Sequence, residues 1–163
     1  METTETTGGA ALREIMRHYP TGVTVISALV RGAGPVGLTA TSFTSVSLDP
    51  PLILACIDVD ASSHDRLIGA DGFAVNILSS AQVDVAARFS TQPGETRFEG
   101  VDWYEGPFGS PVLREAVAWM ECGVEQVHAA GDHSILVGRV RKTSLRGGEV
   151  LTFYRGAFGS LSP

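Results

Sequence analysis

Short segments rich in β-branched residues, joined by brief glycine-containing connections, constrain the fold of this chain most strongly. Short connections favour antiparallel pairing, and closing the sheet on itself removes its exposed edges. The dipeptides Gly-Asp at 131–132 and Gly-Gly at 147–148 suit hairpin turns. The sequence therefore predicts a mainly β fold, an antiparallel barrel of six to seven strands. The expected strands are residues 22–30, a segment starting near 36, 51–58, 73–78, 117–128, 134–144 and 150–155.

Two or three short helices accompany these strands. Four apolar residues recur at helical spacing before Pro20, which disfavours helical geometry in the residue that precedes it. These residues are Leu12, Ile15, Met16 and Tyr19. A second helix is expected within residues 62–70. A third follows the capping box of Ser79 and Gln82 and continues to Phe89.

The length of 163 residues fits a single domain with one sizeable core. We expect a disordered tail at residues 1–9 and one domain at residues 10–163. Residues 90–111 are rich in proline and glycine and are predicted as a loop. Loops of this length are usually functional or disordered.

The charge and the cysteines narrow the class of protein. Twelve Lys and Arg against 18 Asp and Glu give a net charge of −6, which offers no general attraction for nucleic acid. The first residues are polar and acidic, unlike a signal peptide, and no apolar run approaches the ~20 residues of a membrane helix. Cys56 and Cys122 lie in apolar segments and are interpreted as buried, reduced thiols. These features predict a cytoplasmic protein that binds neither membrane nor nucleic acid.

One glycine-rich motif is rejected as a nucleotide site. The sequence GAGPVG at residues 32–37 fits G-x-G-x-x-G, but the β-branched segment after it lacks helical spacing. A hairpin turn is the better interpretation. The motifs of P-loop enzymes, α/β-hydrolases and zincins do not occur in the sequence. Cys122, His128 and His133 match no usual ligand spacing, so no metal site is predicted.

A dense group of hydroxyl side chains is the most unusual local feature. Hydroxyls and free N–H groups at a strand end can hold a phosphate and the polar edge of a planar ring. The same residues are also ordinary on a polar strand face, and their spacing does not decide between the two. The group consists of Thr39, Thr41, Ser42, Thr44, Ser45 and Ser47.

Two further segments have the same two interpretations. Ser62 and Ser63 stand at the start of a predicted helix, where they would bind an anion or simply cap the helix. Arg88 and Phe89 stand at the end of another, where Arg88 would pair with a phosphate or favour the helix C-terminus.

Motifs along the whole chain resemble those of the short-chain flavin reductases, the reductase components of two-component flavin-dependent monooxygenases. The resemblance implies a split-barrel homodimer that passes hydride from NADH or NADPH to FMN or FAD and releases the reduced flavin. The motifs are YPTGVTV (19–25), GLTATSFTSVSLDPP (37–51), FAVNIL (73–78), RFEGVDW (97–103), GDH (131–133) and FYRG (153–156).

The resemblance also assigns site residues. Four of them would line the flavin ring and ribityl chain, namely Thr39, Ala40, Thr41 and Ser42, although relatives often carry Asn in place of Thr41. The remaining cofactor-binding residues would be Cys56 and Asp58 beside the ring, Ser62, Ser63, Arg88 and Phe89 near the phosphate, and Tyr154 and Arg155 in the closing segment. His133 would stand at the mouth, beside flavin and nicotinamide, as the catalytic residue.

The sequence thus predicts an NAD(P)H:flavin oxidoreductase that supplies a separate monooxygenase, with reduced flavin reaching it by diffusion. Hydride transfer needs no nucleophile or acid–base pair, which agrees with the lack of a recognisable dyad. The alternative is a flavin-binding split-barrel protein that retains its cofactor without rapid turnover. The motifs do not decide between FMN and FAD or between NADH and NADPH.

Overall fold

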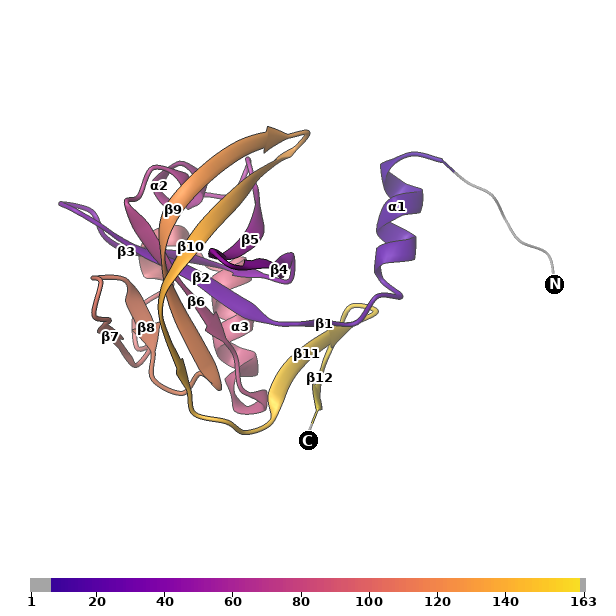
Figure 1. Ribbon diagram of the computed structural model, residues 1–163. Helices are drawn as coiled ribbons and strands as arrows, with labels where there is room; N and C mark the ends of the chain where they lie inside the picture. The colour runs from indigo at the N-terminus through magenta and orange to yellow at the C-terminus, as the bar shows by residue number, and fades with distance from the viewer. Residues whose placement is uncertain (1–6, 162–163) are drawn as a thin grey trace.

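The computed structural model describes residues 7–161 and consists mainly of antiparallel strands (Figure 1). Three helices are present in this part of the chain: α1 (Gly9–Met16), α2 (His64–Ile68) and α3 (Val83–Thr91). Two single 3₁₀ turns, η1 (Ser80–Gln82) and η2 (Gly94–Thr96), flank α3. The strands are β1 (Thr21–Gly22), β2 (Thr24–Val30), β3 (Gly34–Ala40), β4 (Phe43–Leu48), β5 (Pro51–Asp58), β6 (Gly72–Ile77), β7 (Trp103–Glu105), β8 (Pro111–Leu113), β9 (Ala118–Ala130), β10 (His133–Leu145), β11 (Val150–Tyr154) and β12 (Ala157–Leu161).

A seven-stranded sheet in the order β3-β2-β6-β9-β10-β5-β4 forms the body of the protein. β3 and β4 lie at opposite ends of this order, yet only Thr41 and Ser42 separate them in the chain. The sheet must therefore curl until its two edges approach each other. At this seam, where Thr41 and Ser42 link β3 to β4, the Cys56 N–H donates to the Ser42 carbonyl over 3.0 Å and the Ser42 hydroxyl donates to the Cys56 carbonyl over 2.8 Å, which extends the β4–β5 pairing into the link. The predicted antiparallel barrel is confirmed, but its seventh strand is β4 rather than the predicted strand at 150–155, which forms β11 in a separate sheet.

Two clusters of buried side chains stabilise the barrel. One fills its interior, where Phe73, Ile57 and Leu136 are fully buried. The other lies between α3 and the strands and includes Phe89, whose ring packs edge-on against Phe98 with centroids 4.8 Å apart. α3 is thereby fixed against one face of β3 and brings its end to the seam.

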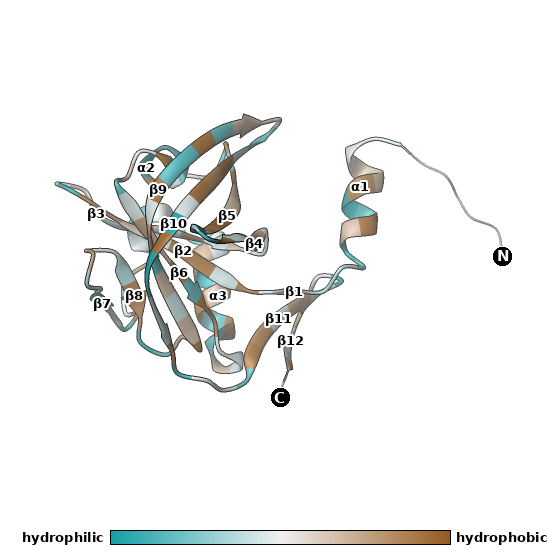
Figure 2. Cartoon of the chain, in the orientation of Figure 1, coloured by the Kyte–Doolittle hydropathy of each residue, from teal (hydrophilic) through white to brown (hydrophobic). Residues whose placement is uncertain are grey.

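An arm made of α1 and a small sheet in the order β1-β11-β12 extends from the barrel (Figure 1). α1 buries none of its residues. It is held to the β11–β12 turn by Arg17, whose carbonyl accepts from the Arg155 N–H over 3.1 Å and whose Nη2 donates to the Arg155 carbonyl over 3.3 Å. Figure 2 shows hydrophobic segments on α1 that no other part of residues 7–161 covers. Its exposed apolar residues, with those next to it, are Leu12, Ile15, Met16 and Tyr19.

Several details differ from the sequence-based expectations. The Gly-Gly at 147–148 does not make a hairpin, because β10 pairs with β9 and β5 whereas β11 pairs with β1 and β12. The described residues contain twelve strands, since short strands such as β1 and β12 lack the alternation used to find the others. The expected loop at 90–111 contains η2, β7 and the start of β8. Of the expected tail, residues 1–6 lie outside the described part, and α1 already begins at Gly9.

The other turn predictions agree with the structure. The Gly-Asp turn at 131–132 joins β9 to β10, and the GAGPVG motif forms the β2–β3 hairpin rather than a nucleotide-binding turn. The capping box of Ser79 and Gln82 is present, although it opens the turn η1 before α3. Among residues 7–161, no helix has both the length and the apolar character needed to cross a bilayer.

Candidate functional site

A cavity of about 610 Å³ opens where the edges of the barrel meet, and we call it the seam cavity. Its walls come from residues 38–42 at the end of β3 and its link to β4, residues 56–62 from the end of β5 to the turn before α2, the end of α3, Arg97 after η2, and the start of β10. Five separate regions of the sequence therefore contribute to one space. The lining residues are Leu38, Thr39, Ala40, Thr41, Ser42, Cys56, Asp58, Asp60, Ala61, Ser62, Phe89, Ser90, Arg97 and His133.

Most of the residues predicted for the site lie together in this cavity. Nine of the thirteen line it, namely Thr39, Ala40, Thr41, Ser42, Cys56, Asp58, Ser62, Phe89 and His133. The four that do not are Ser63, Arg88, Tyr154 and Arg155. The seam thus places residues from distant motifs within reach of a single ligand.

The hydroxyl groups of the seam differ in how much hydrogen-bonding capacity they retain. Thr39 Oγ1 donates to the Ala86 carbonyl over 2.7 Å and so ties β3 to α3. The Ser42 hydroxyl donates to the carbonyl of Cys56 on β5. Thr41 is exposed, and its side chain makes no hydrogen bond within residues 7–161. Thr39 and Ser42 can therefore only accept from a ligand, whereas Thr41 can also donate.

A buried cation stands at one end of the seam cavity. Arg97 is only 7% exposed, and its Nη1 donates to the Gly37 carbonyl over 2.7 Å and to Ser63 Oγ over 3.0 Å. Its Nε donates to the Gln92 carbonyl over 2.9 Å. Burial lowers the pKa of the Arg97 guanidinium below its usual value.

No carboxylate neutralises Arg97 among the described residues. Glu95, the one acidic group that acts on it electrostatically, pairs with Arg66 over 3.3 Å. Charged groups are rarely buried without a partner, because the desolvation cost is large. Together with the Ser62 hydroxyl in the same wall, Arg97 fits an anionic group such as a phosphate.

The structure gives different positions to the three residues predicted beside Ser62. Ser63 occupies the N-cap position of α2 but makes no capping hydrogen bond, and donates instead to the Gly37 carbonyl over 3.1 Å. Arg88 does not line the cavity, and its Nη1 donates to the Thr96 carbonyl over 3.5 Å. Phe89 is fully buried and forms part of both the cavity wall and the core.

Sequence reasoning missed Arg97 as a functional residue. The motif RFEGVDW begins with it, but a single arginine in a predicted loop carries no signal of burial. Only the fold reveals that η2 and the turn after it press this side chain under β3, against Gly37.

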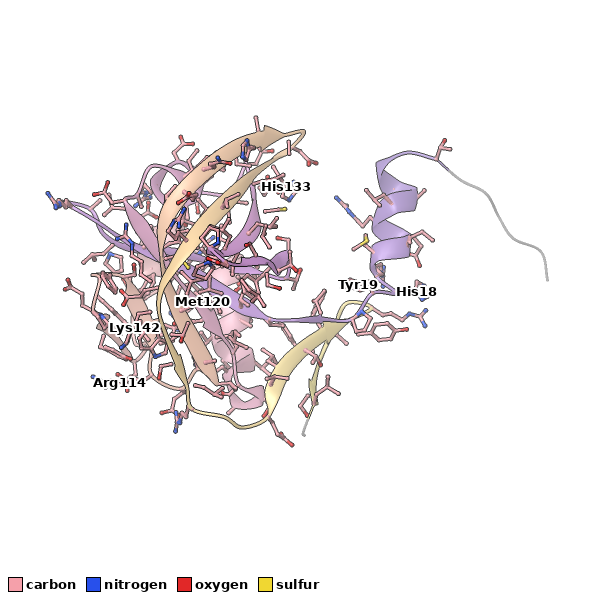
Figure 3. All side chains as sticks on the ribbon, in the orientation of Figure 1. His18, Tyr19, Arg114, Met120, His133 and Lys142 are labelled. Carbon is pink, nitrogen blue, oxygen red and sulfur yellow. The ribbon has the colours of Figure 1, made fainter. Side chains whose placement is uncertain are left out.

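His133 stands at the mouth of the seam cavity, at the tip of the hairpin of β9 and β10 and on the side toward α1 (Figure 3). It is the register partner of Asp58 on β5, so both line the same edge. Its Nδ1 lies 2.7 Å from Asp132 Oδ1. The hydrogen bond from His133, more than any other cause, lowers the pKa of the Asp132 carboxyl below its usual value. Asp132 thereby fixes the ring orientation and leaves Nε2 free of that contact.

A second cavity of about 580 Å³ lies between the arm and the barrel, and we call it the arm chamber. It shares Thr41, Ser42 and Cys56 with the seam cavity, so the two spaces meet at the seam. Arg155 lines this chamber from the β11–β12 turn, where its φ of 51° is the left-handed conformation. Tyr154 is half-exposed and lines neither space.

The two cysteines have different environments. Cys122 is buried, as expected, and burial raises its pKa to about 12. Cys56 is only partly buried, so the expectation of a buried thiol is wrong for it. Both thiols are free. Cys56 lies on β5, whose side chains alternate, and the seam leaves it open to both cavities.

Comparison with known proteins decides the family. The sequence description of the flavin reductase like domain matches residues 16–162. The chain belongs to the flavin reductase family. The resemblance read from the motifs and the split-barrel fold are thereby confirmed.

Similar flavin reductases come from several bacteria. The chain is 47% identical over 148 residues, 91% of its length, to the stachydrine N-demethylase reductase subunit Stc3 of Rhizobium meliloti, and it spans only 64% of that protein. It is 41% identical to an NADH-dependent FAD reductase of Streptomyces globisporus, covering 93% of this chain and 85% of the other. The solved structure of the Streptomyces globisporus NADH:FAD oxidoreductase SgcE6 superposes with a TM-score of 0.89 at 38% identity, covering 100% and 99% of the two chains.

Proposed function

We propose that this protein is an NAD(P)H:flavin oxidoreductase that reduces FMN or FAD and releases the reduced flavin to a separate monooxygenase component. The observation that carries the proposal is the seam cavity, in which hydroxyl groups, the uncompensated charge of Arg97 and the ring of His133 face one space. The names of the relatives favour turnover over retention of the flavin, and they support NADH and FAD as the first pair to test.

Arg97 and Ser62 are the proposed phosphate-binding residues. The guanidinium is already held by two carbonyls and Ser63, so it would lose little side-chain entropy on binding. Ser63 acts through Arg97 rather than on the ligand. In this assignment Arg88 stabilises the segment around Thr96 and contributes to binding only indirectly.

The ring and its side chain would lie along the seam. Ala40 and Thr41 allow close approach of the backbone at the end of β3, and Thr39 and Ser42 present oxygens that accept hydrogen bonds. Cys56 and Asp58 form the facing edge on β5. Tyr154 and Arg155 belong to the arm, where Arg155 would meet the nicotinamide nucleotide.

The overall reaction is NAD(P)H + H⁺ + flavin → NAD(P)⁺ + reduced flavin. When bound, the flavin supplies the ring that accepts hydride from the nicotinamide. The chain contributes orientation, because two rings must be held face to face for the transfer. His133, at the mouth shared by both ligands, would bind the nicotinamide or offset the negative charge of the reduced flavin. Water leaves the seam as the two ligands fill it, which strengthens these polar contacts.

We further propose that the protein is a homodimer in the cytoplasm. The exposed apolar residues of α1 and the separation of the arm from the barrel suit a surface that a second copy covers. The free thiols fit a reducing compartment. The oxygenase would receive reduced flavin by diffusion, without a stable complex.

Steady-state loss of nicotinamide absorbance tests the activity. Catalytic amounts of protein would be assayed with NADH or NADPH against FMN or FAD in all four pairings. Rapid turnover with excess free flavin is expected. Tight flavin binding without turnover in any pairing would instead assign the alternative, a flavin-retaining protein.

A matched pair of variants tests the phosphate site. Arg97→Gln is expected to weaken flavin binding at least about tenfold, since a charge-assisted contact is lost. Arg88→Gln, the same change of charge on the neighbouring segment, is expected to alter it less than about twofold. The reverse ranking, measured by flavin fluorescence titration on folded variants, would return the phosphate role to Arg88.

A further inference from the structure

The arm chamber carries a concentration of positive charge that the reaction chemistry at the seam leaves unexplained. Three arginines line it, Arg13, Arg17 and Arg155, and none of its lining residues is acidic. The protein as a whole has a net charge of −6. Such a local excess of one sign focuses the field within a cavity and attracts ligands of the opposite charge.

Arg13 and Arg155 are the two arginines of the chamber whose side chains make no hydrogen bond or ion pair within residues 7–161. Arg17, by contrast, is held to the Arg155 carbonyl and lies 3.9 Å from Glu14. Arg13 lies on the last turn of α1 and lines the chamber from the side opposite the barrel.

A second group in the same wall also lacks a partner. Thr21 Oγ1 is buried without a hydrogen bond to any described residue, and Thr21 lines the arm chamber. A buried hydroxyl left unpaired is costly, so a partner from outside the chain is expected. Arg13 and Thr21 are therefore two polar groups in the wall of one chamber that lack a hydrogen-bond partner within residues 7–161.

The rest of the chamber suits a nucleotide. Tyr19, Phe43 and Phe153 supply flat aromatic surface against which a base can stack. The wall shared with the seam cavity brings a ligand of this chamber into contact with a ligand of the other. Arg13 also acts electrostatically on Asp132, so α1 faces the tip of the hairpin that carries His133.

We propose that Arg13, assisted by Thr21, binds a phosphate group of the hydride donor, so that α1 is part of the nicotinamide-nucleotide site. The inference rests on the proposed function, in which the seam cavity holds the flavin. It assigns to α1 a role in substrate affinity: the helix positions the donor, and the seam positions the acceptor. Hydride transfer itself does not involve Arg13.

The first test is Arg13→Gln against the control Arg31→Gln. Arg31 lies on the β2–β3 turn, far from the arm in Figure 1. Its replacement by Gln removes the same charge as Arg13→Gln. Arg13→Gln is expected to raise the KM for NADH about tenfold, with kcat within twofold and the KM for flavin unchanged. Arg31→Gln is expected to leave all three values unchanged. An unchanged KM for NADH in Arg13→Gln, or a rise confined to the KM for FMN or FAD, would overturn the proposal.

Two donors identify the phosphate. An equal rise of KM for NADH and NADPH would assign Arg13 to the pyrophosphate, and a larger rise for NADPH than for NADH would show that Arg13 also contacts the 2′-phosphate. Either result supports binding of a donor phosphate. Arg13→Lys is expected to recover most of the affinity in both cases because it keeps the charge.

Thr21→Val separates a binding role from a structural one. If the unpaired Thr21 hydroxyl only destabilises the folded chain, the isosteric change raises the free energy of unfolding and leaves the KM for NADH unchanged. That result would contradict a role of Thr21 in donor binding. The expected result is a rise of about threefold in that KM. Thr21→Val leaves the charge of α1 unchanged. It therefore still tests the binding site if sedimentation shows that Arg13→Gln changes the oligomeric state.

Direct binding keeps the inference separate from the proposed activity. NADH fluorescence titration of the flavin-free protein gives a dissociation constant without turnover. If the unaltered protein shows no turnover, the proposed function fails. A tenfold weaker NADH affinity in Arg13→Gln would then still support the site, and an equal affinity would refute it.

Discussion

The barrel and the arm both contain apolar segments, but the two regions differ sharply in how much of these segments is buried. Five of the seven residues of β2 in the barrel are fully buried, whereas all five residues of β12 in the arm are exposed. α1 has apolar residues at regular helical spacing and still buries none of them. An apolar pattern therefore predicts that a face will be covered, but not which surface covers it.

The two thiols provide the largest contrast between the interior and the seam. Cys56 is expected to react with a thiol reagent at least about a thousandfold faster than Cys122, because Cys122 must await opening of the barrel. Because burial raises the pKa of Cys122 to about 12 and the thiolate is the reactive form, the reaction of Cys122 in the folded barrel is expected to be still accelerating with pH at pH 11 rather than levelling off.

Counting modified thiols against time, with and without denaturant, measures this ratio. Excess flavin should slow the modification of Cys56 and leave the modification rate of Cys122 unchanged. Equal rates in the native protein would mean that the barrel does not shield its interior from the seam.

Phe73→Ala tests the barrel directly. Phe73 is fully buried within the interior cluster, so its removal is expected to lower the free energy of unfolding by about 3–5 kcal/mol. Guanidinium denaturation, followed by far-ultraviolet circular dichroism, gives the value. A loss under about 1 kcal/mol would show that this interior repacks easily.

Gly138→Ala is expected to lower the free energy of unfolding by less than Phe73→Ala does. Its effect comes from an added atom rather than from a cavity. A Cβ at this position would lie 2.5 Å from Phe73 Cζ and 2.9 Å from Cys122 Cβ, which is too close for either atom. Overpacking of this kind costs about 1–3 kcal/mol. The same denaturation experiment checks it, and Phe73→Leu in the same chain should relieve part of the loss.

Ile15→Ser is expected to change the stability of the isolated chain least, by no more than about 0.5 kcal/mol, because Ile15 is 70% exposed. If a second copy covers α1, however, the variant should sediment with the mass of one chain at concentrations where the unaltered protein does not. Ile15→Leu is the control. An unchanged mass for Ile15→Ser would remove the helix from the proposed dimer surface.

The sequence predicted the barrel well because its strands carry local signals. The β-branched segment of β2, the continuous apolar run of β5 and the Gly-Asp turn before His133 each gave a correct element. The Gly-Gly at 147–148 failed as a hairpin because partner choice is a long-range property: a flexible turn permits a change of sheet as readily as a return.

The site was predicted to the extent that motifs marked it. Residues 39–42 and His133 came from motif resemblance, and they line one cavity. Arg97 and Arg13, which we propose as phosphate-binding residues, were not singled out from the sequence, because the fold decides what surrounds a charged group. No spacing rule distinguishes Arg97 from Arg88, yet the fold buries the first against Gly37 and leaves the second beside Thr96.

The short link at Thr41 and Ser42 makes ligand binding a reporter of folding. β3 and β4 are the two edges of the sheet, so the end of β3 and the start of β10 reach one cavity only after the intervening strands have paired, whereas the Cys56–Ser42 hydrogen bonds continue the local β4–β5 pairing. The pocket is thus a late product of assembly, and a bound flavin would lock the last step. Amide hydrogen exchange at Cys56 should slow in the presence of flavin, while amides deep in β2 and β6 should respond only to global unfolding.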